Sequence, residues 1–309
     1  MSNVIEIEGL RKTYRRRGQV TVAIDGLDLT VPEGGVFGFL GPNGSGKTTS
    51  IRCLLGLARP TAGQLRLLGH RVPEGLGAGM RRIGSIVETP ALFPTMTARE
   101  NLRLLGSVDG IGPRRVEAAL EMVGLSDRGD DLVKKYSLGM RQRLALGAAV
   151  LKEPDVLVLD EPANGLDPAG MREVRDLLRR FAAEGRTVFV SSHILTEIEQ
   201  TCDRVAILAA GRCVTHGSVD EVLAAAGHRV GILVKVEDLV VGGRVLEAAG
   251  LVVERVDDAL RVEVDPGAAA HITRLLADAD QWVTELRPHR FSLEDVFLEL
   301  TNAPEEVAA

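Results

Sequence analysis

The feature that most constrains this chain is a glycine-rich segment between an apolar run and a helical pattern. Residues 36–40 form the apolar run, and residues 41–49 read GPNGSGKTT. Residues 50–57 then carry apolar side chains at helical spacing. The order strand, glycine-rich loop and helix predicts an α/β core whose loop binds a phosphate group.

The residue types in this loop suit phosphate chemistry. Gly41, Gly46, Lys47 and Thr48 fit the pattern G-x-x-x-x-G-K-[ST]. Glycines let backbone N–H groups turn toward a phosphate, and the following helix N-terminus adds partial positive charge. Lys47 is placed to reach the β- and γ-phosphates and the Thr48 hydroxyl to ligate Mg²⁺, which predicts a site for ATP and Mg²⁺. The predicted nucleotide-binding residues of the loop are Gly41, Pro42, Asn43, Gly44, Ser45, Gly46, Lys47, Thr48 and Thr49.

Two acidic residues end a second buried strand in VLVLDEP. Ligands of open α/β sheets bind at the carboxyl ends of the strands. We therefore expect Asp160 to be the Mg²⁺ partner, either as a direct ligand or through another ligand, and Glu161 to be the general base that polarises the attacking water. The alternative is a pair of acids that only ends a strand. His193 follows a third strand, TVFVSS, and either contacts the γ-phosphate and the water or is structural.

Composition limits the other functions open to the chain. The chain has 309 residues, a net charge of −6 and three widely spaced cysteines. The net charge argues against a general nucleic-acid binder, and the cysteines give neither a disulfide framework nor a zinc spacing. The N-terminus does not resemble a signal peptide, and no apolar run is long enough to span a bilayer. A membrane role would therefore need a partner chain.

The patterns along the chain predict two domains. Helical periodicity fills most of residues 97–152, between strand-like segments, and indicates a helical insert in an α/β core. Composition shifts near residues 224–228, and strand-like and helix-like patches alternate beyond that point. We predict a first domain at 1–225 with a helical subdomain at about 90–152, and a small α+β domain at 226–309. In the last helical pattern, Ser292 and Asp295 predict a capping box.

Taken together, these segments resemble the ATP-binding cassette (ABC) family over about residues 1–220. The matching segments are Tyr14 in GLRKTYRRRG, GPNGSGKTT, the signature segment YSLGMRQR, VLVLDEP, NGLD at residues 164–167, and His193. The resemblance implies a phosphate-loop NTPase core of ABC type. It also implies that Tyr14 stacks on adenine and that His193 is the switch histidine.

The resemblance further implies a site shared by two chains. In the family, the signature segment of the opposite subunit closes over the γ-phosphate. Here Ser137 and Gly139 would contact that phosphate, and Asp167 of the D-loop is also predicted among the nucleotide-binding residues. ATP would then lie between two copies in a two-fold homodimer. The alternative interpretation of YSLGMRQR is an ordinary amphipathic helix that Ser137 caps.

Two residues of YSLGMRQR and one residue elsewhere depart from the commonest family pattern. Leu138 and Met140 stand where LSGGQ has glycine and glutamine, a variant similar to that of drug- and antibiotic-export ATPases. Glu88, in IGSIVETP, stands where the family usually has glutamine. We predict that Glu88 faces the magnesium and the water, contributing to catalysis and metal binding.

The resemblance implies the ATP-hydrolysing motor of an ABC exporter for a drug-like, antibiotic or lipid-like compound. Its partner would be a separate membrane permease, which would hold it on the cytoplasmic face of the cell membrane, and no nucleic acid is expected. Leu92, Phe93 and Met96 would contact the permease or pack internally. The alternatives are a soluble ABC-type ATPase acting on nucleic acid or ribosomes, and a phosphate-loop kinase outside the family. The first usually carries two cassettes or long insertions, and YSLGMRQR and NGLD argue against the second.

Overall fold

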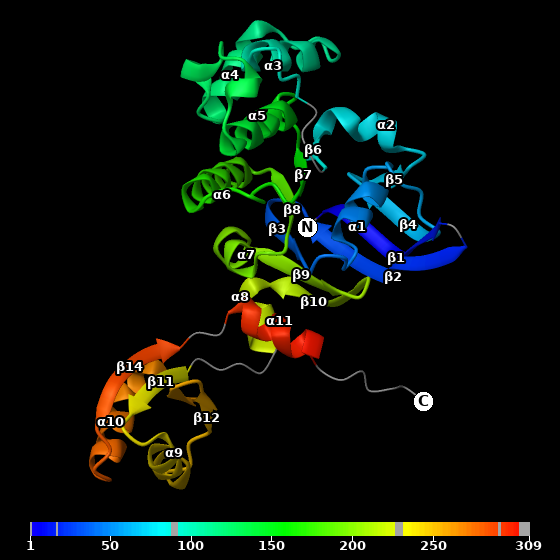
Figure 1. Cartoon of the computed structure of the whole chain (residues 1–309). Coiled ribbons are helices and arrows are strands. Elements are labelled where there is room, and N and C mark those ends of the chain that lie inside the picture. Colours follow the sequence, from blue (N-terminus) through cyan, green and yellow to red (C-terminus); the bar gives the residue numbers. More distant parts are fainter. Residues whose placement is uncertain (1, 17, 88–91, 226–230, 290–291, 303–309) are drawn as a thin grey trace. The chain divides into compact units, whose positions relative to one another are not determined.

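The computed structural model describes residues 2–16, 18–87, 92–225, 231–289 and 292–302 (Figure 1). The chain forms two compact units, Met1–Val219 and Asp220–Ala309. The domain boundary predicted at residue 225 lies slightly later and stays a prediction. Among the described residues, no helix has both the length and the apolar character needed to cross a bilayer.

A six-stranded sheet organises the first unit, with the strand order β10-β9-β3-β8-β7-β6. The strands are β3 (Gly35–Leu40), β6 (Ile83–Ile86), β7 (Val156–Asp160), β8 (Thr187–Ser192), β9 (Arg204–Ala209) and β10 (Arg212–Ser218). All neighbouring pairs are parallel except β9 with β10. The carboxyl ends of β3, β7 and β8 therefore meet at one edge, as the sequence predicted for the loop and the acidic residues.

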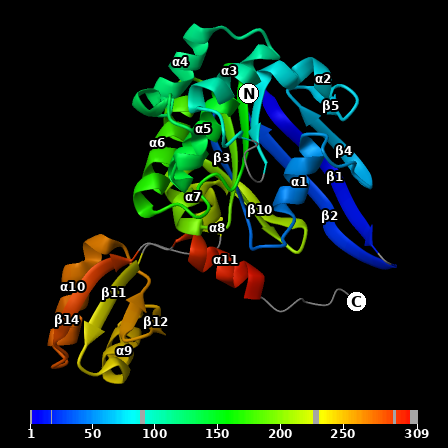
Figure 2. The same ribbon diagram turned by 45° about the horizontal axis from the view of Figure 1, so that its top comes forward.

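A second sheet of the first unit is antiparallel, with the order β2-β1-β4-β5 (Figure 2). Its strands are β1 (Asn3–Arg16), β2 (Gln19–Pro32), β4 (Ala62–Leu67) and β5 (His70–Val72). The predicted strands at residues 4–7 and 27–31 are parts of much longer ones. Gly9 has a φ of 55°, and the register with β2 shifts between Ile7 and Leu10. Such a bulge interrupts the alternation of side chains, which hides the rest of the strand from sequence patterns.

Helix α1 (Lys47–Leu54) and both sheets share one apolar core. Ile51 and Leu54 of this helix are buried, as their spacing predicted. The helix begins at Lys47 rather than at residue 50, so the lysine belongs to its first turn. Aromatic rings join the central strands, because Phe189 of β8 stacks on Phe37 of β3 with 5.9 Å between the ring centroids.

Helices dominate the region between β6 and β7, as expected from residues 97–152. Figure 2 shows α3, α4 and α5 together at one end of the first unit. The helices of this unit are α2 (Leu76–Gly79), α3 (Ala98–Ser107), α4 (Pro113–Met122), α5 (Leu138–Val150), α6 (Pro168–Ala183) and α7 (Leu195–Thr201), and α8 (Val219–Ala225) crosses the boundary between units. Short 3₁₀ turns occupy Met80–Arg82, Ser126–Arg128 and Val133–Lys135, and a fourth, Pro266–Ala268, lies in the second unit.

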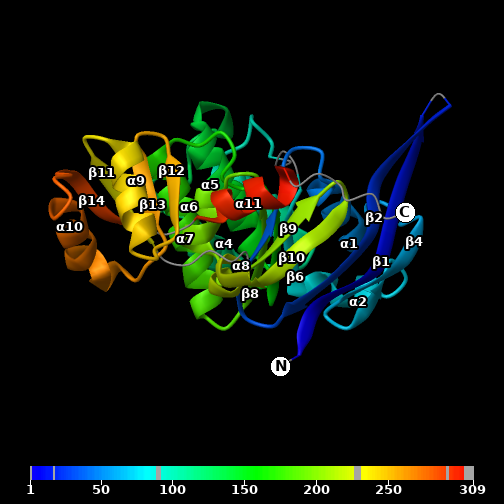
Figure 3. The ribbon, with the colours of Figure 1, turned by 90° about the horizontal axis from the view of Figure 1, so that it is seen from below.

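The second unit is an α+β fold, in agreement with the predicted fold class. Its sheet has the order β12-β13-β11-β14, and Figure 3 shows β11 beside β14. Its elements are β11 (Gly231–Val236), α9 (Leu239–Ala248), β12 (Val253–Val256), β13 (Ala259–Val262), α10 (Ala269–Ala277), β14 (Val283–His289) and α11 (Leu293–Asn302). Buried side chains of the sheet pack against Leu246 of α9 and Ile272 of α10. The predicted capping box is confirmed, because Asp295 N–H donates to Ser292 Oγ and Ser292 N–H to the Asp295 carboxylate.

Candidate functional site

The glycine-rich loop at residues 41–49 has a backbone that only glycine tolerates at its tightest points. Gly46 has a φ of 105°, and a Cβ atom there would lie 2.6 Å from the carbonyl oxygen of Ala23. A Cβ atom on Gly41 would lie 2.4 Å from Ser45 Oγ. The first turn of α1 has no side-chain cap and no acidic residue. Its backbone N–H groups are therefore available to an anion, and the loop fits the phosphate predicted for it.

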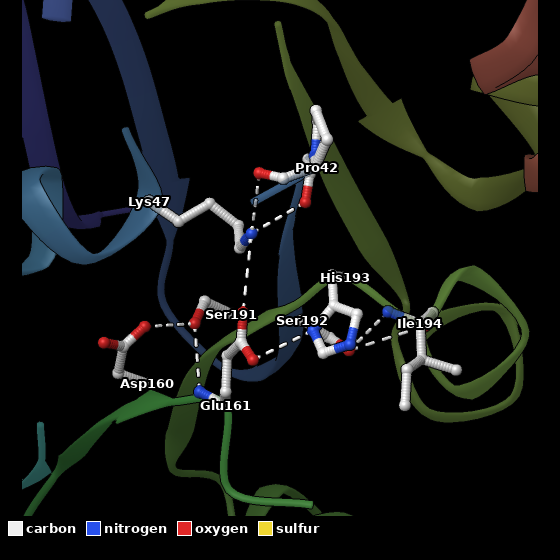
Figure 4. A network of polar contacts seen from close by, with 9 residues as sticks. Pro42, Lys47, Asp160, Glu161, Ser191, Ser192, His193 and Ile194 are labelled. Atoms are coloured by element: carbon white, nitrogen blue, oxygen red, sulfur yellow. Dashed lines mark hydrogen bonds and ion pairs between the residues drawn. The ribbon is translucent and has the colours of Figure 1, made fainter. Parts of the chain in front are cut away.

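Lys47 is buried in this loop, with only 4% of its surface exposed. Its ammonium donates hydrogen bonds to the carbonyl oxygens of Gly41, at 2.7 Å, and Pro42, at 3.2 Å. Figure 4 shows that Lys47 also points toward Glu161, with 3.5 Å between Nζ and Oε1. Burial lowers the pKa of Lys47, and the charge of Glu161 partly opposes that shift. The lysine is thus a cation inside the loop, held by groups that a phosphate could replace.

The two acidic residues of VLVLDEP occupy different positions at the end of β7. Asp160 is 7% exposed and accepts a hydrogen bond of 2.6 Å from the hydroxyl of Ser191. Glu161 follows with a φ of 47°, in the left-handed region that non-glycine residues rarely adopt. Such a conformation typically costs about 1–3 kcal/mol and is found mostly at functional sites. The turn aims the carboxylate of Glu161 toward Lys47 and His193 (Figure 4).

His193 contacts the carboxylate of Glu161 directly. Its Nδ1 lies 2.9 Å from Glu161 Oε2. Because a carboxylate only accepts hydrogen bonds, the proton of this bond sits on Nδ1. Ser192, which precedes His193, accepts a bond of 2.9 Å from the backbone N–H of Ile194 and so shapes the turn beside the ring. The sequence placed His193 at this edge of the sheet, but its pairing with Glu161 appears only in the structure.

Thr48, Asp160 and Glu161 line one cavity of about 690 Å³. The opposite wall includes Leu138 and Arg141 of α5. A hydroxyl and a carboxylate are oxygen ligands of the kind that Mg²⁺ prefers, and Mg²⁺ usually takes its other ligands from water and phosphate. The described residues contain no cluster of three or more Asp, Glu, His or Cys side chains that could hold a metal by itself. The residues present therefore fit a Mg²⁺ ion bound together with a nucleotide.

Three of the predicted signature and D-loop residues, Ser137, Gly139 and Asp167, line a different cavity, of about 330 Å³. Ser137 caps α5, its Oγ accepting a bond of 3.2 Å from Met140 N–H. Asp167 caps α6, its carboxylate accepting a bond of 2.9 Å from Gly170 N–H. Gly139 lies beside this loop, since a Cβ atom on it would be 3.8 Å from the side chain of Leu166. The structure thus brings Ser137, Gly139 and Asp167 together, away from the cavity that contains Thr48.

Tyr14 lies on β1 and is 39% exposed. Lys12, two residues earlier on the same strand face, places its ammonium 4.8 Å from the centre of the ring. Lys12 pairs with Ile24 of β2, and Ile24 lies beside Gly46 of the phosphate loop. The ring is therefore accessible and its strand runs past the loop. Its stacking on adenine stays a prediction.

Two further residues bear on the site: Glu88, which the sequence predicted, and Ser191, which it did not. Glu88 lies outside the described residues, so its predicted roles stay untested. Ser191 was missed by the sequence reasoning, although it donates to Asp160 and accepts from the backbone N–H of Glu161 at 3.0 Å. Its position in TVFVSSH, at the carboxyl end of a strand, was the signal that could have found it.

Comparison with known proteins decides the family. The family model described as "ABC transporter" matches residues 24–164. The bacitracin transport ATP-binding protein BcrA of Enterococcus faecalis is 37% identical over 304 residues, covering 97% of each chain. The chain belongs to the ABC transporter ATP-binding proteins.

Two further similarities agree with this assignment. The daunorubicin resistance ATP-binding protein DrrA3 of Streptomyces coeruleorubidus is 37% identical over 96% of this chain and 95% of its own length. The solved structure of cbiO1 from Clostridium perfringens, described as part of the ABC transporter complex cbiONQ, has a TM-score of 0.64 and 28% identity. That likeness covers 72% of this chain and 92% of cbiO1.

Family membership settles the general activity. The chain is an ATP-binding, ATP-hydrolysing motor subunit with a phosphate-loop NTPase core of ABC type, as the sequence predicted. The names of these relatives refer to transport and resistance, so they do not support the alternative of an ATPase acting on nucleic acid or ribosomes. Its match to ABC relatives along almost the whole chain also argues against a kinase outside the family.

Proposed function

We propose that this subunit hydrolyses ATP with Mg²⁺ between two copies of itself and thereby drives export through a separate permease. The observation that supports it is that Ser137, Gly139 and Asp167 line a different cavity from the one that Thr48 and Asp160 line, although Leu138 lines both. Each chain then carries two half-sites, and a second copy related by two-fold symmetry would complete both of them.

The phosphate-loop half holds the nucleotide in this proposal. Lys47 leaves its contact with Glu161 to bind the β- and γ-phosphates, while the N–H groups at the start of α1 bind the same charge. Thr48 and Asp160 would hold Mg²⁺, which would neutralise part of the phosphate charge. Tyr14 holds the adenine ring by stacking, a contact worth about 1–3 kcal/mol by analogy with bases on aromatic side chains.

Glu161 acts as the general base in this scheme. Its carboxylate is fixed on one side by His193, so it is already oriented when a nucleotide displaces Lys47. Removing the lysine contact frees Oε1 to accept a proton from the attacking water. His193 positions that carboxylate and keeps its own proton on Nδ1.

We also propose that Glu88 faces the magnesium. A Glu88→Gln variant with unchanged Mg²⁺ dependence and turnover would refute this role.

The second copy contributes Ser137, Gly139 and Asp167. The hydroxyl of Ser137 already accepts a backbone N–H bond, so its own proton is free to be donated to a γ-phosphate oxygen. Gly139 has no side chain that would keep the phosphate away from the start of α5. Asp167 only accepts hydrogen bonds, so it contacts donors of the other chain rather than the phosphate.

Mixing two inactive variants tests the shared site. Lys47→Ala damages the phosphate loop, and Ser137→Ala damages the signature segment. A heterodimer of the two has one doubly damaged site and one intact site, so an equal mixture should regain about a quarter of wild-type ATPase activity. If the mixture is no more active than either variant alone, both halves of the site belong to the same chain and the proposal is wrong.

We propose that the permease docks on an apolar groove between the core and the helical insert. This groove is a cavity of about 460 Å³ lined by Met80 and Ile86 on one side and Leu105 and Ala148 on the other. Leu92, for which the sequence left open a permease contact or internal packing, also lines it. Val108 at its rim is 85% exposed, which suits a partner with an apolar helix.

The relatives named for bacitracin transport and daunorubicin resistance favour an antibiotic or drug-like substrate, and a permease partner would hold the chain on the cytoplasmic face of the membrane. The test is the ATPase rate of the purified chain with and without its permease, against a panel of such compounds. A rate that responds to no compound in the presence of the permease would contradict the export role.

A further inference from the structure

Ser191 is the penultimate residue of β8, has no exposed surface and lies beside both Asp160 and Glu161. Figure 4 shows its hydroxyl between Asp160 and the backbone of Glu161. The hydroxyl oxygen accepts from Glu161 N–H at 3.0 Å and lies 2.6 Å from Asp160 Oδ1. The backbone carbonyl of Ser191 accepts from the same N–H at 3.2 Å. One serine is thus hydrogen-bonded to both acidic residues.

The direction of these bonds follows from the atoms involved. A hydroxyl has one proton, and an ionised carboxylate only accepts. Since Glu161 N–H already donates to Ser191 Oγ, the hydroxyl proton is directed to Asp160 Oδ1. In the part of the chain that the structure describes, Asp160 Oδ2 makes no hydrogen bond. Ser191 therefore fixes one oxygen of Asp160 and leaves the other free beside the cavity that contains Thr48.

Ser191 also supports the unusual backbone of Glu161. That residue has a φ of 47°, and its only backbone donor is shared between the carbonyl and the hydroxyl of Ser191. Two residues further along the chain, His193 binds the Glu161 carboxylate. The end of β8 consequently holds Glu161 at both its backbone and its side chain.

We propose that Ser191 is a positioning residue for ATP hydrolysis, its hydroxyl orienting Asp160 toward Mg²⁺ and fixing the backbone from which Glu161 acts. This inference rests on the roles proposed above for Asp160 and Glu161. It adds a residue that touches neither nucleotide nor water and acts only through those two carboxylates.

Thr187 provides a matched control at the other end of the same strand. It is 1% exposed, and its hydroxyl accepts a hydrogen bond of 2.8 Å from the backbone N–H of Gly34. Thr187→Val removes a buried hydroxyl from β8 as Ser191→Ala does, but it leaves the site untouched. Any loss common to both variants is therefore structural.

The test uses the full chain and compares Ser191→Ala, Ser191→Thr and Thr187→Val. The measurements are nucleotide binding across a Mg²⁺ titration, kcat and KM for ATP, and Tm. Ser191→Ala should weaken the Mg²⁺ dependence of binding and lower kcat by about 10–100-fold, the usual effect of losing a residue that orients a metal ligand. Nucleotide binding without Mg²⁺ should stay unchanged. Ser191→Thr keeps a hydroxyl and should retain most of both properties, and Thr187→Val should lower only Tm.

Two further variants separate this inference from the proposed function. If Ser191 acts on Mg²⁺ through Asp160, Ser191→Ala combined with Asp160→Asn should show no weaker Mg²⁺ dependence than Asp160→Asn alone. An impaired Asp160→Asn beside a normal Ser191→Ala would overturn the inference and leave the role of Asp160 intact. A normal Asp160→Asn would instead overturn the proposed role of Asp160, and the inference with it.

Discussion

The phosphate-loop half and the signature half of the proposed nucleotide site are built differently. In the first, the cation of Lys47 is buried and compensated by loop carbonyls and by Glu161. In the second, the polar groups of Ser137 and Asp167 each cap their own helix. The first half is a charged network that a ligand must rearrange, whereas the second is a pair of helix starts that keeps its local bonds.

This difference indicates how the two halves would respond to ATP. A phosphate entering the loop takes Lys47 away from Glu161, so binding itself changes the surroundings of the proposed base. At the signature half, the Ser137 hydroxyl has a spare proton and can contact a phosphate without losing its cap. The first half would therefore switch its contacts, and the second would only add to them.

The largest expected effect comes from replacing the proposed general base, which should lower hydrolysis without preventing ATP binding. Glu161→Gln keeps the shape of the side chain but removes the charge that faces Lys47 and His193. We expect kcat to fall by about 10²–10⁴-fold while ATP binding persists and a stable dimer accumulates. Single-turnover assays, nucleotide binding and light scattering measure the three quantities. Glu184→Gln, at an exposed position after α6, is the control, and normal hydrolysis in Glu161→Gln would remove Glu161 from the role of base.

Ser137→Ala tests the signature half. Loss of one preorganised donor to the γ-phosphate should lower turnover by about 10²–10³-fold. Binding of ATP to the isolated chain should be unaffected, because the other half provides it. Thr97→Ala is the matched control, since Thr97 caps α3 by accepting from Glu100 N–H. Both changes should cost about 1 kcal/mol of stability as lost caps, and equal turnover in the two variants would refute the role of Ser137.

Lys47→Met tests how much the buried cation of the phosphate-loop half lowers the free energy of unfolding. In the folded chain burial lowers the pKa of Lys47, so the unfolded chain binds more protons just below the ordinary lysine pKa of about 10.4. Stability of the wild type should therefore rise with pH in that window, and this rise should be absent in Lys47→Met. Urea unfolding at several pH values measures it.

The same variant should keep or raise its Tm without nucleotide but lose the stabilisation that saturating nucleotide gives. For a ligand at one hundred times its Kd, that stabilisation is about 2.7 kcal/mol. A Lys47→Met chain still stabilised by ATP to this extent would show that the lysine is not a phosphate ligand.

The smallest effect concerns the contact that joins the two helices of the signature half. Arg143 of α5 lies 3.3 Å from Glu173 of α6, and Arg143 also donates to the carbonyl oxygen of Val123 at 3.3 Å. Glu173→Gln should cost less than about 1 kcal/mol, because the glutamate is largely exposed. Arg143→Ala should cost more, since it also leaves that carbonyl without its donor. Thermal unfolding compares them, and the reverse order would show that the ion pair dominates.

How well the sequence predicted a feature depends on how far apart along the chain the residues that determine it lie. The order of strand, glycine-rich loop and helix around residues 41–49 was predicted correctly because short neighbouring segments determine it, although the helix begins at Lys47 rather than at residue 50. The strands β7 and β8 were also found from their continuous apolar runs. The full lengths of β1 and β2 were missed, because a bulge at Gly9 breaks the alternation on which the prediction relied.

The polar contacts of the site were less predictable than its residues. Sequence patterns named Lys47, Asp160, Glu161 and His193 but gave no pairing among them. The left-handed backbone of Glu161 contradicts the usual preference for glycine, so no local rule would place it there. Ser191 was missed because its position near the carboxyl end of a strand indicates a place beside the site but does not indicate which groups its hydroxyl contacts.

By itself, the sequence determined the family, the phosphate loop and the residue types available for chemistry, because these depend on short segments in a fixed order. Only the tertiary structure decided which of those groups meet. The parallel pairing of β3, β7 and β8 sets Lys47 3.5 Å from Glu161 and Ser191 2.6 Å from Asp160. It also places Ser137 and Asp167 together in a separate cavity. Such contacts depend on strand register across the sheet, which no local pattern specifies.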